Sequence, residues 1–215
     1  MSDIMKLKEA TGAGVLDCKK ALDETNGDYE KAVALLREKG KAKALKKGNS
    51  DRITAEGVVG SYIHMGGKIG VLVEINCETD FAQKSDKFNQ LVKDVAMHIA
   101  AANPKYVNAS EVPAEVLEHE KEILKKQAME EGKPAAIAER MVEGRIKKYY
   151  QDYCLMDQPF VKDGSKTIAD VVNETVAFVG EKITIRRFVR YEMGEGIEKP
   201  QEDFAAEVSK TIAAK

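Results

Sequence analysis

Residues 57–76, GVVGSYIHMGGKIGVLVEIN, decide the fold of this chain. In the second half of this segment, apolar residues alternate with others, as in a β-strand with one buried face: Ile69, Val71, Val73 and Ile75. The first half, 57–64, is a second candidate strand, and Met65-Gly66-Gly67-Lys68 between them is typical of a turn. The segment therefore predicts an antiparallel hairpin. No helix begins directly after its glycines, so they fit a turn better than a phosphate-binding loop.

Helical periodicity follows the hairpin. Ser85 is a candidate N-cap for a helix that ends by Asn103-Pro104, and a pair of helices is expected over about 113–154. Gly132-Lys133-Pro134 divides this pair, which predicts an antiparallel helical hairpin. Thr167 is a candidate cap for one more short helix.

A third strand is predicted over 182–192, KITIRRFVRYE, far along the chain from the first two. Its alternation slips at Arg186-Arg187, where we expect a β-bulge. A last helix is expected over about 202–214, with an apolar stripe at Phe204, Val208 and Ile212. Strands drawn from distant parts of the chain and covered by helices indicate an α+β fold with a three-stranded antiparallel sheet.

Before the hairpin, three short helical patterns precede a basic stretch. The third pattern is expected to stop at Gly40, and Asp28 is a candidate cap at its start. Residues 40–52, GKAKALKKGNSDR, hold five basic side chains against one acidic, with little apolar surface. We therefore predict a three-helix module over 1–40, a basic linker over 41–54, an α+β core over 55–192, and a tail with its helix over 193–215.

Composition excludes several classes of protein. The 215 residues carry 34 Lys and Arg against 36 Asp and Glu, and 43% are apolar, a globular balance. No run reaches the roughly 18 apolar residues of a membrane span. The N-terminus is charged where a signal peptide would be apolar, so we expect a soluble, non-secreted protein without a membrane partner.

Catalytic and metal-binding patterns are missing from the sequence. The three cysteines, Cys18, Cys77 and Cys154, are odd in number and far apart, which indicates small buried residues rather than a disulfide framework. The three histidines show no metal-ligand spacing. Neither a Walker loop nor a dinucleotide fingerprint nor a nucleophilic triad is present. We predict a protein that is not an enzyme and uses no cofactor and no metal.

Thr79-Asp80-Phe81 is the most informative short segment. It lies directly after a well-patterned strand and before a capped helix, where side chains are free to project. One interpretation places Phe81 in the core and makes Asp80 a helix cap. The other is an exposed aromatic wedge with an acidic neighbour, held on a rigid scaffold for a partner's pocket.

Five motifs in order along the chain closely resemble the elongation factor Ts family, the guanine-nucleotide exchange factors of elongation factor Tu. TGAGVLDCKKAL over 11–22 resembles the N-terminal signature, and NCETDF over 76–81 resembles the second signature. Three further motifs are similar to the C-terminal half: MVEGR over 141–145, QPFV over 158–161 and GEGIEK over 194–199. The resemblance covers nearly the whole chain.

The resemblance implies an exchange factor that supports translation elongation and binds elongation factor Tu·GDP. It implies that Thr79, Asp80 and Phe81 form the exchange element, with the Phe beside the partner's switch region and the Asp perturbing its magnesium and phosphate surroundings. It also implies a ubiquitin-associated-like three-helix module that docks on the partner. Leu7, Val15 and Leu16 are candidate contacts there, although such a small core also needs these residues. Phe204, Val208 and Ile212 are candidate contacts of the last helix.

The chain resembles the shorter members of the family, whose core leaves room for one sheet. A symmetric homodimer would complete that core, and the exposed sheet edge near Arg186-Arg187 is where we expect self-pairing. The resemblance implies a cytoplasmic protein, or one of an organelle matrix or stroma.

Two other functions compete with this interpretation. The basic linker and the Arg186, Arg187, Arg190 cluster fit an RNA-associated accessory protein, but no aromatic stacking motif accompanies them and no direct nucleic-acid binding is expected. A thiol enzyme using Cys77 lacks a nearby histidine.

Overall fold

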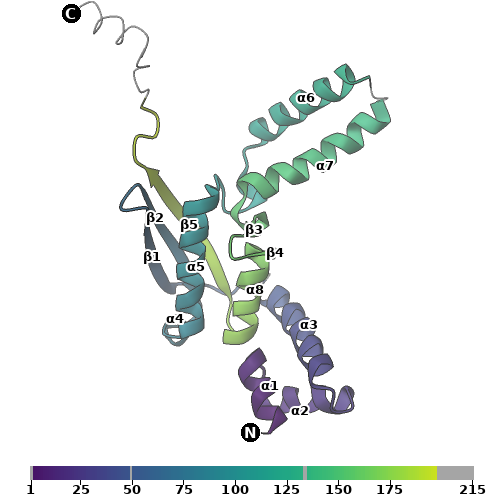
Figure 1. The fold of residues 1–215 in the computed structure, drawn as a ribbon, viewed down its shortest axis with the longest axis vertical. Helices are drawn as coiled ribbons and strands as arrows, with labels where there is room; N and C mark the ends of the chain where they lie inside the picture. Colours follow the sequence, from purple (N-terminus) through teal and green to yellow (C-terminus); the bar gives the residue numbers. More distant parts are fainter. Residues whose placement is uncertain (1, 49, 133–134, 198–215) are drawn as a thin grey trace, which may run out of the picture.

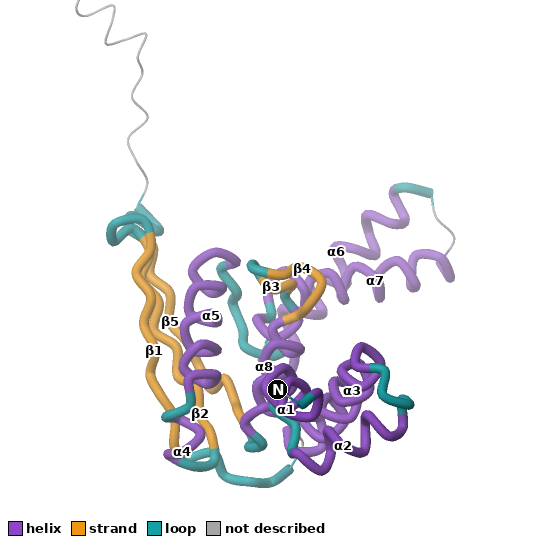
Figure 2. Tube along the Cα trace, turned by 60° about the horizontal axis from the view of Figure 1, so that its bottom comes forward, coloured by secondary structure: helices purple, strands orange, loops and turns teal. Residues whose placement is uncertain are grey.

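The computed structural model describes residues 2–48, 50–132 and 135–197. A three-stranded antiparallel sheet lies at its centre, formed by β1 (Glu56–His64), β2 (Ile69–Cys77) and β5 (Ile183–Glu192) in the order β1-β2-β5. Figure 1 shows that strands from both halves of the chain meet in this sheet, which confirms the predicted α+β fold. Helices α5 (Asp86–Ala102) and α8 (Ile168–Val179) lie on one side of the sheet, and the other side carries no helix of the described part (Figure 2).

The strand register confirms which face is buried. Val71, Val73 and Ile75 of β2 are almost fully buried and pack with α5 and α8 in the main core. A side chain at Gly60 of β1 would collide with Val92 of α5, so the glycine permits the close approach of sheet and helix. The register between β2 and β5 shifts where Glu74 pairs with Arg187 and Ile75 with Ile185. Arg186 is therefore the extra residue of a bulge, as predicted.

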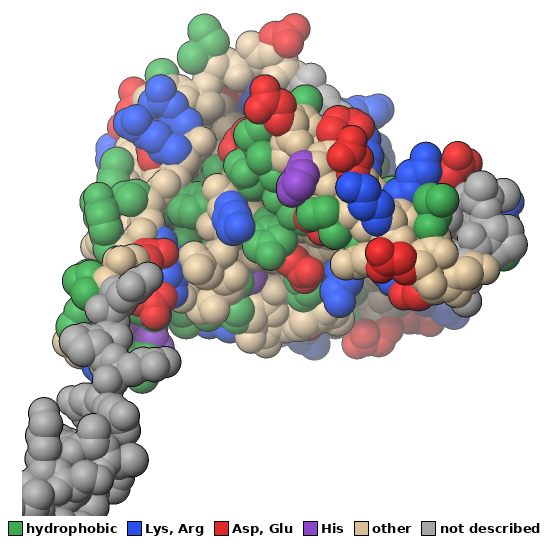
Figure 3. All heavy atoms as spheres, turned by 90° about the horizontal axis from the view of Figure 1, so that it is seen from above, with side chains coloured by type: hydrophobic (Ala, Val, Ile, Leu, Met, Phe, Trp, Pro, Cys, Tyr) green, Lys and Arg blue, Asp and Glu red, His purple; other side chains and the backbone are tan. Residues whose placement is uncertain are grey.

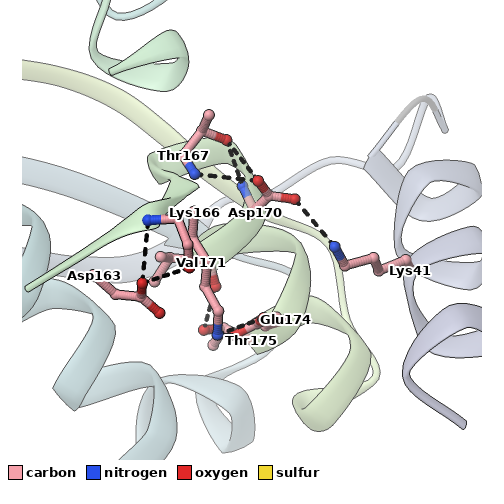
Figure 4. Close-up of polar contacts among 9 residues, drawn as sticks. Lys41, Asp163, Lys166, Thr167, Asp170, Val171, Glu174 and Thr175 are labelled. Carbon is pink, nitrogen blue, oxygen red and sulfur yellow. Dashed lines mark hydrogen bonds and ion pairs between the residues drawn. The ribbon is translucent and has the colours of Figure 1, made fainter. Parts of the chain in front are cut away.

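The predicted helix caps are present. The Ser85 hydroxyl accepts a hydrogen bond from the Phe88 amide at the start of α5, and Asn103 ends that helix in a left-handed conformation. At the start of α8, Thr167 and Asp170 form a reciprocal capping box (Figure 4).

Three helices form the N-terminal region: α1 (Asp3–Thr11), α2 (Val15–Glu24) and α3 (Tyr29–Gly48). The predicted stop at Gly40 is wrong, because α3 continues to Gly48 through most of the basic stretch. A Cβ atom at Gly40 would lie 3.2 Å from Cβ of Ala177 in α8, and Ala44, one turn later, is buried in the main core. Packing of α3 against α8 thus offsets the roughly 1 kcal/mol cost of a glycine inside a helix.

Two further contacts hold α8 against the N-terminal helices. The Lys41 ammonium of α3 lies 3.4 Å from a carboxylate oxygen of Asp170 (Figure 4). The ring of Phe178 covers Gly12, the left-handed residue that ends α1, where a side chain would collide with it. The N-terminal helices are therefore packed on the core.

Beyond the sheet, α6 (Ala114–Glu130) and α7 (Ala135–Tyr153) form the predicted helical hairpin, which projects from the body (Figure 1). A small sheet of β3 (Pro159–Phe160) and β4 (Asp163–Thr167) and two 3₁₀ turns, Ala109–Glu111 and Leu155–Asp157, had no counterpart in the sequence prediction. The predicted last helix with Phe204, Val208 and Ile212 lies outside the described residues. Within the described ranges, none of the helices is both long and apolar enough to cross a membrane.

One buried polar side chain, His98, links α5 to the segment that follows the helical hairpin of α6 and α7. His98 is fully buried, with Nε2 2.9 Å from Oε1 of Gln158, and Nδ1 accepts a hydrogen bond from the amide of Val161. Since Nδ1 accepts, Nε2 carries the proton and the ring is neutral. Burial lowers the pKa of His98.

Candidate functional site

Phe81 projects from a single helical turn at the end of the central strand. β2 ends at the buried Cys77, and α4 (Asp80–Gln83) begins three residues later with Thr79 as its N-cap. The Phe81 side chain is 79% exposed, whereas Ala82 beside it is buried in the core. The interpretation of Phe81 as a core residue is therefore wrong, and the ring stands in solvent on a scaffold anchored by its neighbours.

Thr79 is held by Glu181, a residue far from it in the sequence. Its amide donates a hydrogen bond to Oε2 of Glu181 at 3.0 Å, and its hydroxyl donates to Oε1 of the same carboxylate at 2.7 Å. The Thr79 oxygen also accepts from the Ala82 amide at 3.4 Å, which caps α4. Glu181 thus fixes both the backbone and the side chain of the residue that starts the helix bearing Phe81.

Glu78 makes the reciprocal contact. Its Oε1 accepts a hydrogen bond from the Lys182 amide at 2.7 Å, and its Oε2 lies 2.6 Å from Nη1 of Arg52. The Lys182 hydrogen bond, and then the Arg52 guanidinium, lower the pKa of Glu78. We call Glu78, Thr79, Glu181 and Lys182 the clasp, because two carboxylates each hold the residue that follows the other.

Asp80 does not cap α4 but forms an ion pair with Lys84, the residue that follows this helix. One carboxylate oxygen of Asp80 lies 2.7 Å from Nζ of Lys84, and this hydrogen bond lowers the pKa of Asp80. Lys84 Nζ also lies 5.8 Å from the centroid of the Phe81 ring. A negative charge and an exposed aromatic ring are therefore presented side by side.

Cys77 does not have the surroundings of a nucleophile. The thiol is fully buried and donates a hydrogen bond to the Thr79 carbonyl, and burial raises its pKa. A raised pKa leaves the thiol protonated at neutral pH, so the thiolate that nucleophilic attack requires is scarce. Among the residues that the structure describes, no group of three His, Cys, Asp or Glu side chains could hold a metal ion.

The three apolar candidates of the N-terminal module separate into two environments. Val15 and Leu16, at the start of α2, are 47% and 74% exposed. Leu7 is fully buried in the small core of the three helices, with Cys18 and Leu36 among its neighbours. Leu7 therefore has no surface to offer a partner and is a core residue, whereas Val15 and Leu16 are accessible.

The arginine cluster on β5 is not a free basic patch. Arg186 and Arg187 lie 2.8 and 2.7 Å from the two carboxylate oxygens of Glu74, and they lower the pKa of Glu74 to about 2. Arg190 pairs with Glu192 at 2.9 Å, and its side chain is only 9% exposed. On the face drawn in Figure 3, acidic and basic side chains of the described residues are interspersed. This arrangement weakens the RNA-associated interpretation, because phosphate binding favours a continuous basic stripe.

The pairing of Glu78 and Thr79 with Lys182 and Glu181 is the part of the site that the sequence did not indicate. Glu181 lies 102 residues from Thr79 and follows the glycine that ends α8, a position at which any polar residue is ordinary. Only the return of β5 beside β2 brings the two together.

Comparison with known proteins identifies the family. The chain matches the family model described as "Elongation factor TS" over residues 4–195. It is 61% identical to elongation factor Ts of Desulforamulus reducens over 99% of this chain and 97% of that relative. It is 59% identical to that of Acetivibrio thermocellus over 97% and 96%, and 57% identical to that of Geobacter sulfurreducens over 97% and 95%. A chain that matches this family model over residues 4–195, and these relatives over at least 97% of its length, belongs to the elongation factor Ts family.

Proposed function

We propose that this chain releases GDP from elongation factor Tu by inserting Phe81, with Asp80 beside it, near the switch and magnesium region of that partner. The family is one of nucleotide exchange factors in translation elongation, not of enzymes, and membership gives this chain that class of activity. The relatives are bacterial, and elongation in bacteria takes place in the cytoplasm, where this chain acts. The residue roles are the part that we propose.

The observation that carries the proposal is the exposure of Phe81. An aromatic ring left 79% exposed loses hydrophobic stabilisation in the free protein, which it recovers when a partner buries it. The ring is held on a scaffold of buried strand and capped helix turn, so little ordering is needed at the moment of binding.

The mechanism needs no catalytic group. A GTPase holds GDP through magnesium, a lysine and backbone amides around the phosphates, and a wedge that displaces these groups weakens nucleotide binding. The binding free energy of the wedge drives the displacement. In return, bound GDP lowers the affinity of the GTPase for the exchange protein to the same extent as the exchange protein lowers its affinity for GDP. Asp80, ionised and paired with Lys84, brings a negative charge toward the phosphate surroundings.

Phe81 alone is not sufficient. Accelerating GDP release about 10⁴-fold requires about 5.5 kcal/mol of differential stabilisation, and one buried Phe contributes roughly 2–3 kcal/mol. The exposed Val15 and Leu16 on α2 supply a second contact region in this proposal. Phe204, Val208 and Ile212 remain predicted contacts of the last helix.

We also propose that two copies of this chain associate, and that they do so through the uncovered face of the sheet instead of the edge near Arg186-Arg187 where the sequence led us to expect self-pairing. Both of these arginines are paired with Glu74 of their own chain. Side chains on that face are large, apolar and exposed on all three strands: Val59, Ile63, Leu72, Val189 and Tyr191. An apolar sheet face of this kind packs readily on a second sheet, and a second copy offers the same face with matching hydrophobic character. Glu74 lies on this face too, opposite Val59 and Arg187, and its ion pairs with Arg186 and Arg187 keep its carboxylate from being an unpaired charge there.

Release of fluorescent GDP from elongation factor Tu tests the proposed activity. Catalytic amounts of the chain should accelerate release in proportion to their concentration. An equal rate with and without the chain would contradict the proposal.

A further inference from the structure

We infer that Glu181 is the positioning residue of the exchange element Thr79-Asp80-Phe81, and this inference rests on the proposed function. Glu181 does not belong to any of the segments that carry the family resemblance. It touches the element through Thr79 alone, yet both donor groups of that residue bind its carboxylate, at 2.7 and 3.0 Å. A carboxylate that accepts two hydrogen bonds from one residue fixes that residue in orientation as well as in place.

The helix turn that carries Phe81 depends on this anchoring. α4 comprises only Asp80–Gln83, and a single turn is not stable in isolation because helix nucleation is costly. Its only buried residue is Ala82, a small side chain, so packing alone constrains the turn weakly. The Thr79 cap defines where the turn begins, and Glu181 holds the cap.

The backbone on both sides of Glu181, between α8 and β5, is itself held in place. Gly180 ends α8 in a left-handed conformation with φ of 81°, and Ile183, two residues after Glu181, is buried at the start of β5. The Lys182 amide is bound by Glu78, so the connection between α8 and β5 is held from both sides of the clasp. Glu181 therefore anchors Thr79 to the rigid core. It does so by joining the connection after β2 to the connection between α8 and β5, which lie far apart in the sequence.

Loss of Glu181 should affect nucleotide exchange more than it affects binding to the partner. When the clasp is intact, the Phe81 ring meets its partner already oriented, and no free energy is used to order the turn. Without Glu181 the chain still folds and still docks through its other contacts, but the turn samples other conformations and displaces the nucleotide less often. Glu181 should therefore influence the maximal rate of GDP release more than the concentration of chain that gives half of it.

The experiment compares fluorescent-GDP release from elongation factor Tu for the full chain and its variants Glu181→Ala, Glu181→Gln and Glu56→Ala. Glu56→Ala is the matched control, because Glu56 is an exposed carboxylate opposite Cys77 on β1 whose side chain bonds to none of the described residues. The maximal rate should fall about tenfold for Glu181→Ala, the size expected for losing charge-assisted hydrogen bonds. The half-saturating concentration should stay within about twofold of the starting chain. Glu181→Gln keeps one acceptor and should be intermediate, and Glu56→Ala should behave as the starting chain.

A double-mutant cycle with Phe81→Ala separates positioning from general loss of structure. Once the ring is absent, Glu181→Ala should reduce the maximal rate by less than about twofold further. A further tenfold loss of maximal rate in the Phe81→Ala background would overturn the inference. So would a rise in the half-saturating concentration with an unchanged maximal rate, because partial unfolding lowers the concentration of active chain and leaves the maximal rate unchanged.

If Glu181→Ala does not fold, Glu181→Gln provides the same comparison. If the starting chain releases GDP and Phe81→Ala does not, but both Glu181 variants match the starting chain, only the role of Glu181 is refuted. Failure of the starting chain to release GDP would refute the proposed function and this inference together.

Discussion

Glu78 and Glu181 each accept a hydrogen bond from the backbone amide of the residue that follows the other, Lys182 at 2.7 Å and Thr79 at 3.0 Å. This reciprocal arrangement joins the connection after β2 to the connection before β5. The exposed Phe81 follows two residues after Thr79, so the ring is carried by a segment held at its start by two carboxylates. Rigid support beneath an exposed side chain is what a wedge requires, because a flexible ring would lose binding free energy on ordering.

Asp80→Ala should slow nucleotide exchange by a smaller factor than Phe81→Ala. The substitution removes the negative charge beside the ring and the ion pair with Lys84, but this pair is exposed and contributes little to folding. Stopped-flow release of labelled GDP, with thermal unfolding as a control, measures both effects. Exchange kinetics equal to those of the starting chain would reduce Asp80 to a local partner of Lys84.

Leu7→Ala and Leu16→Ala should have opposite profiles. Leu7 is fully buried, so its truncation should destabilise the N-terminal helices by about 2–5 kcal/mol. Leu16 is 74% exposed, so its truncation should leave the free energy of unfolding within about 0.5 kcal/mol and weaken binding to elongation factor Tu. Denaturant unfolding and calorimetric titration separate the two. Undiminished affinity of a folded Leu16→Ala chain would remove α2 from the proposed interface.

Leu72→Glu should shift the chain from dimer to monomer. Leu72 lies in the middle of the uncovered sheet face, opposite Ser61 on β1 and Val189 on β5, and a carboxylate buried there would be desolvated without a partner. Leu45→Glu, which places the same charge at an exposed leucine of α3, is the control. Sedimentation velocity should show a dimer for the starting chain and the control. A monomeric starting chain at micromolar concentration would contradict the proposed association.

Acid should destabilise the chain through His98. Its folded-state pKa is lowered by burial, so the unfolded state takes up a proton first as the pH falls below its ordinary value of about 6.5. The stability contributed by the neutral ring is therefore complete above that pH and is lost below it, by at most about 1.4 kcal/mol per pH unit. Urea unfolding at pH 7.5 and pH 5.5 measures the loss, and the dependence should be weaker in His98→Gln. Equal dependence in both chains would show that the proton goes elsewhere.

Local sequence patterns were sufficient to predict most of the helices and strands. They were insufficient to predict where some of these elements end and which segments connect them. The hairpin over 57–76 and the caps at Ser85 and Thr167 depend on neighbouring residues, so periodicity and cap chemistry found them. The local pattern predicts a helix end at Gly40, but α3 continues through it, because the packing that tolerates this glycine, against Ala177, is a tertiary contact that the local sequence does not show. The strand β3 is too short for alternation to be visible, and β4, with the sequence DGSKT, has no apolar residue to alternate.

The site was predictable only in part for the same reason. A strand followed by a capped helix places Thr79, Asp80 and Phe81 on a connection, and the structure leaves Phe81 exposed there. Glu181 could not be found, because nothing near Gly180 in the sequence distinguishes a carboxylate that binds Thr79 from one that faces solvent. Leu7, Val15 and Leu16 are apolar residues close together in the sequence, and only the packing of three helices separates the buried residue from the exposed ones.

The most direct measurement is the rate of labelled GDP release from elongation factor Tu in the presence of Phe81→Ala. Met129→Ala, which truncates another exposed apolar side chain near the end of α6, is the control for loss of surface. We predict that Phe81→Ala keeps the unfolding temperature of the starting chain and loses at least about tenfold in release rate, since one buried Phe contributes roughly 2–3 kcal/mol. A Phe81→Ala chain that is folded and releases GDP as fast as Met129→Ala would contradict it.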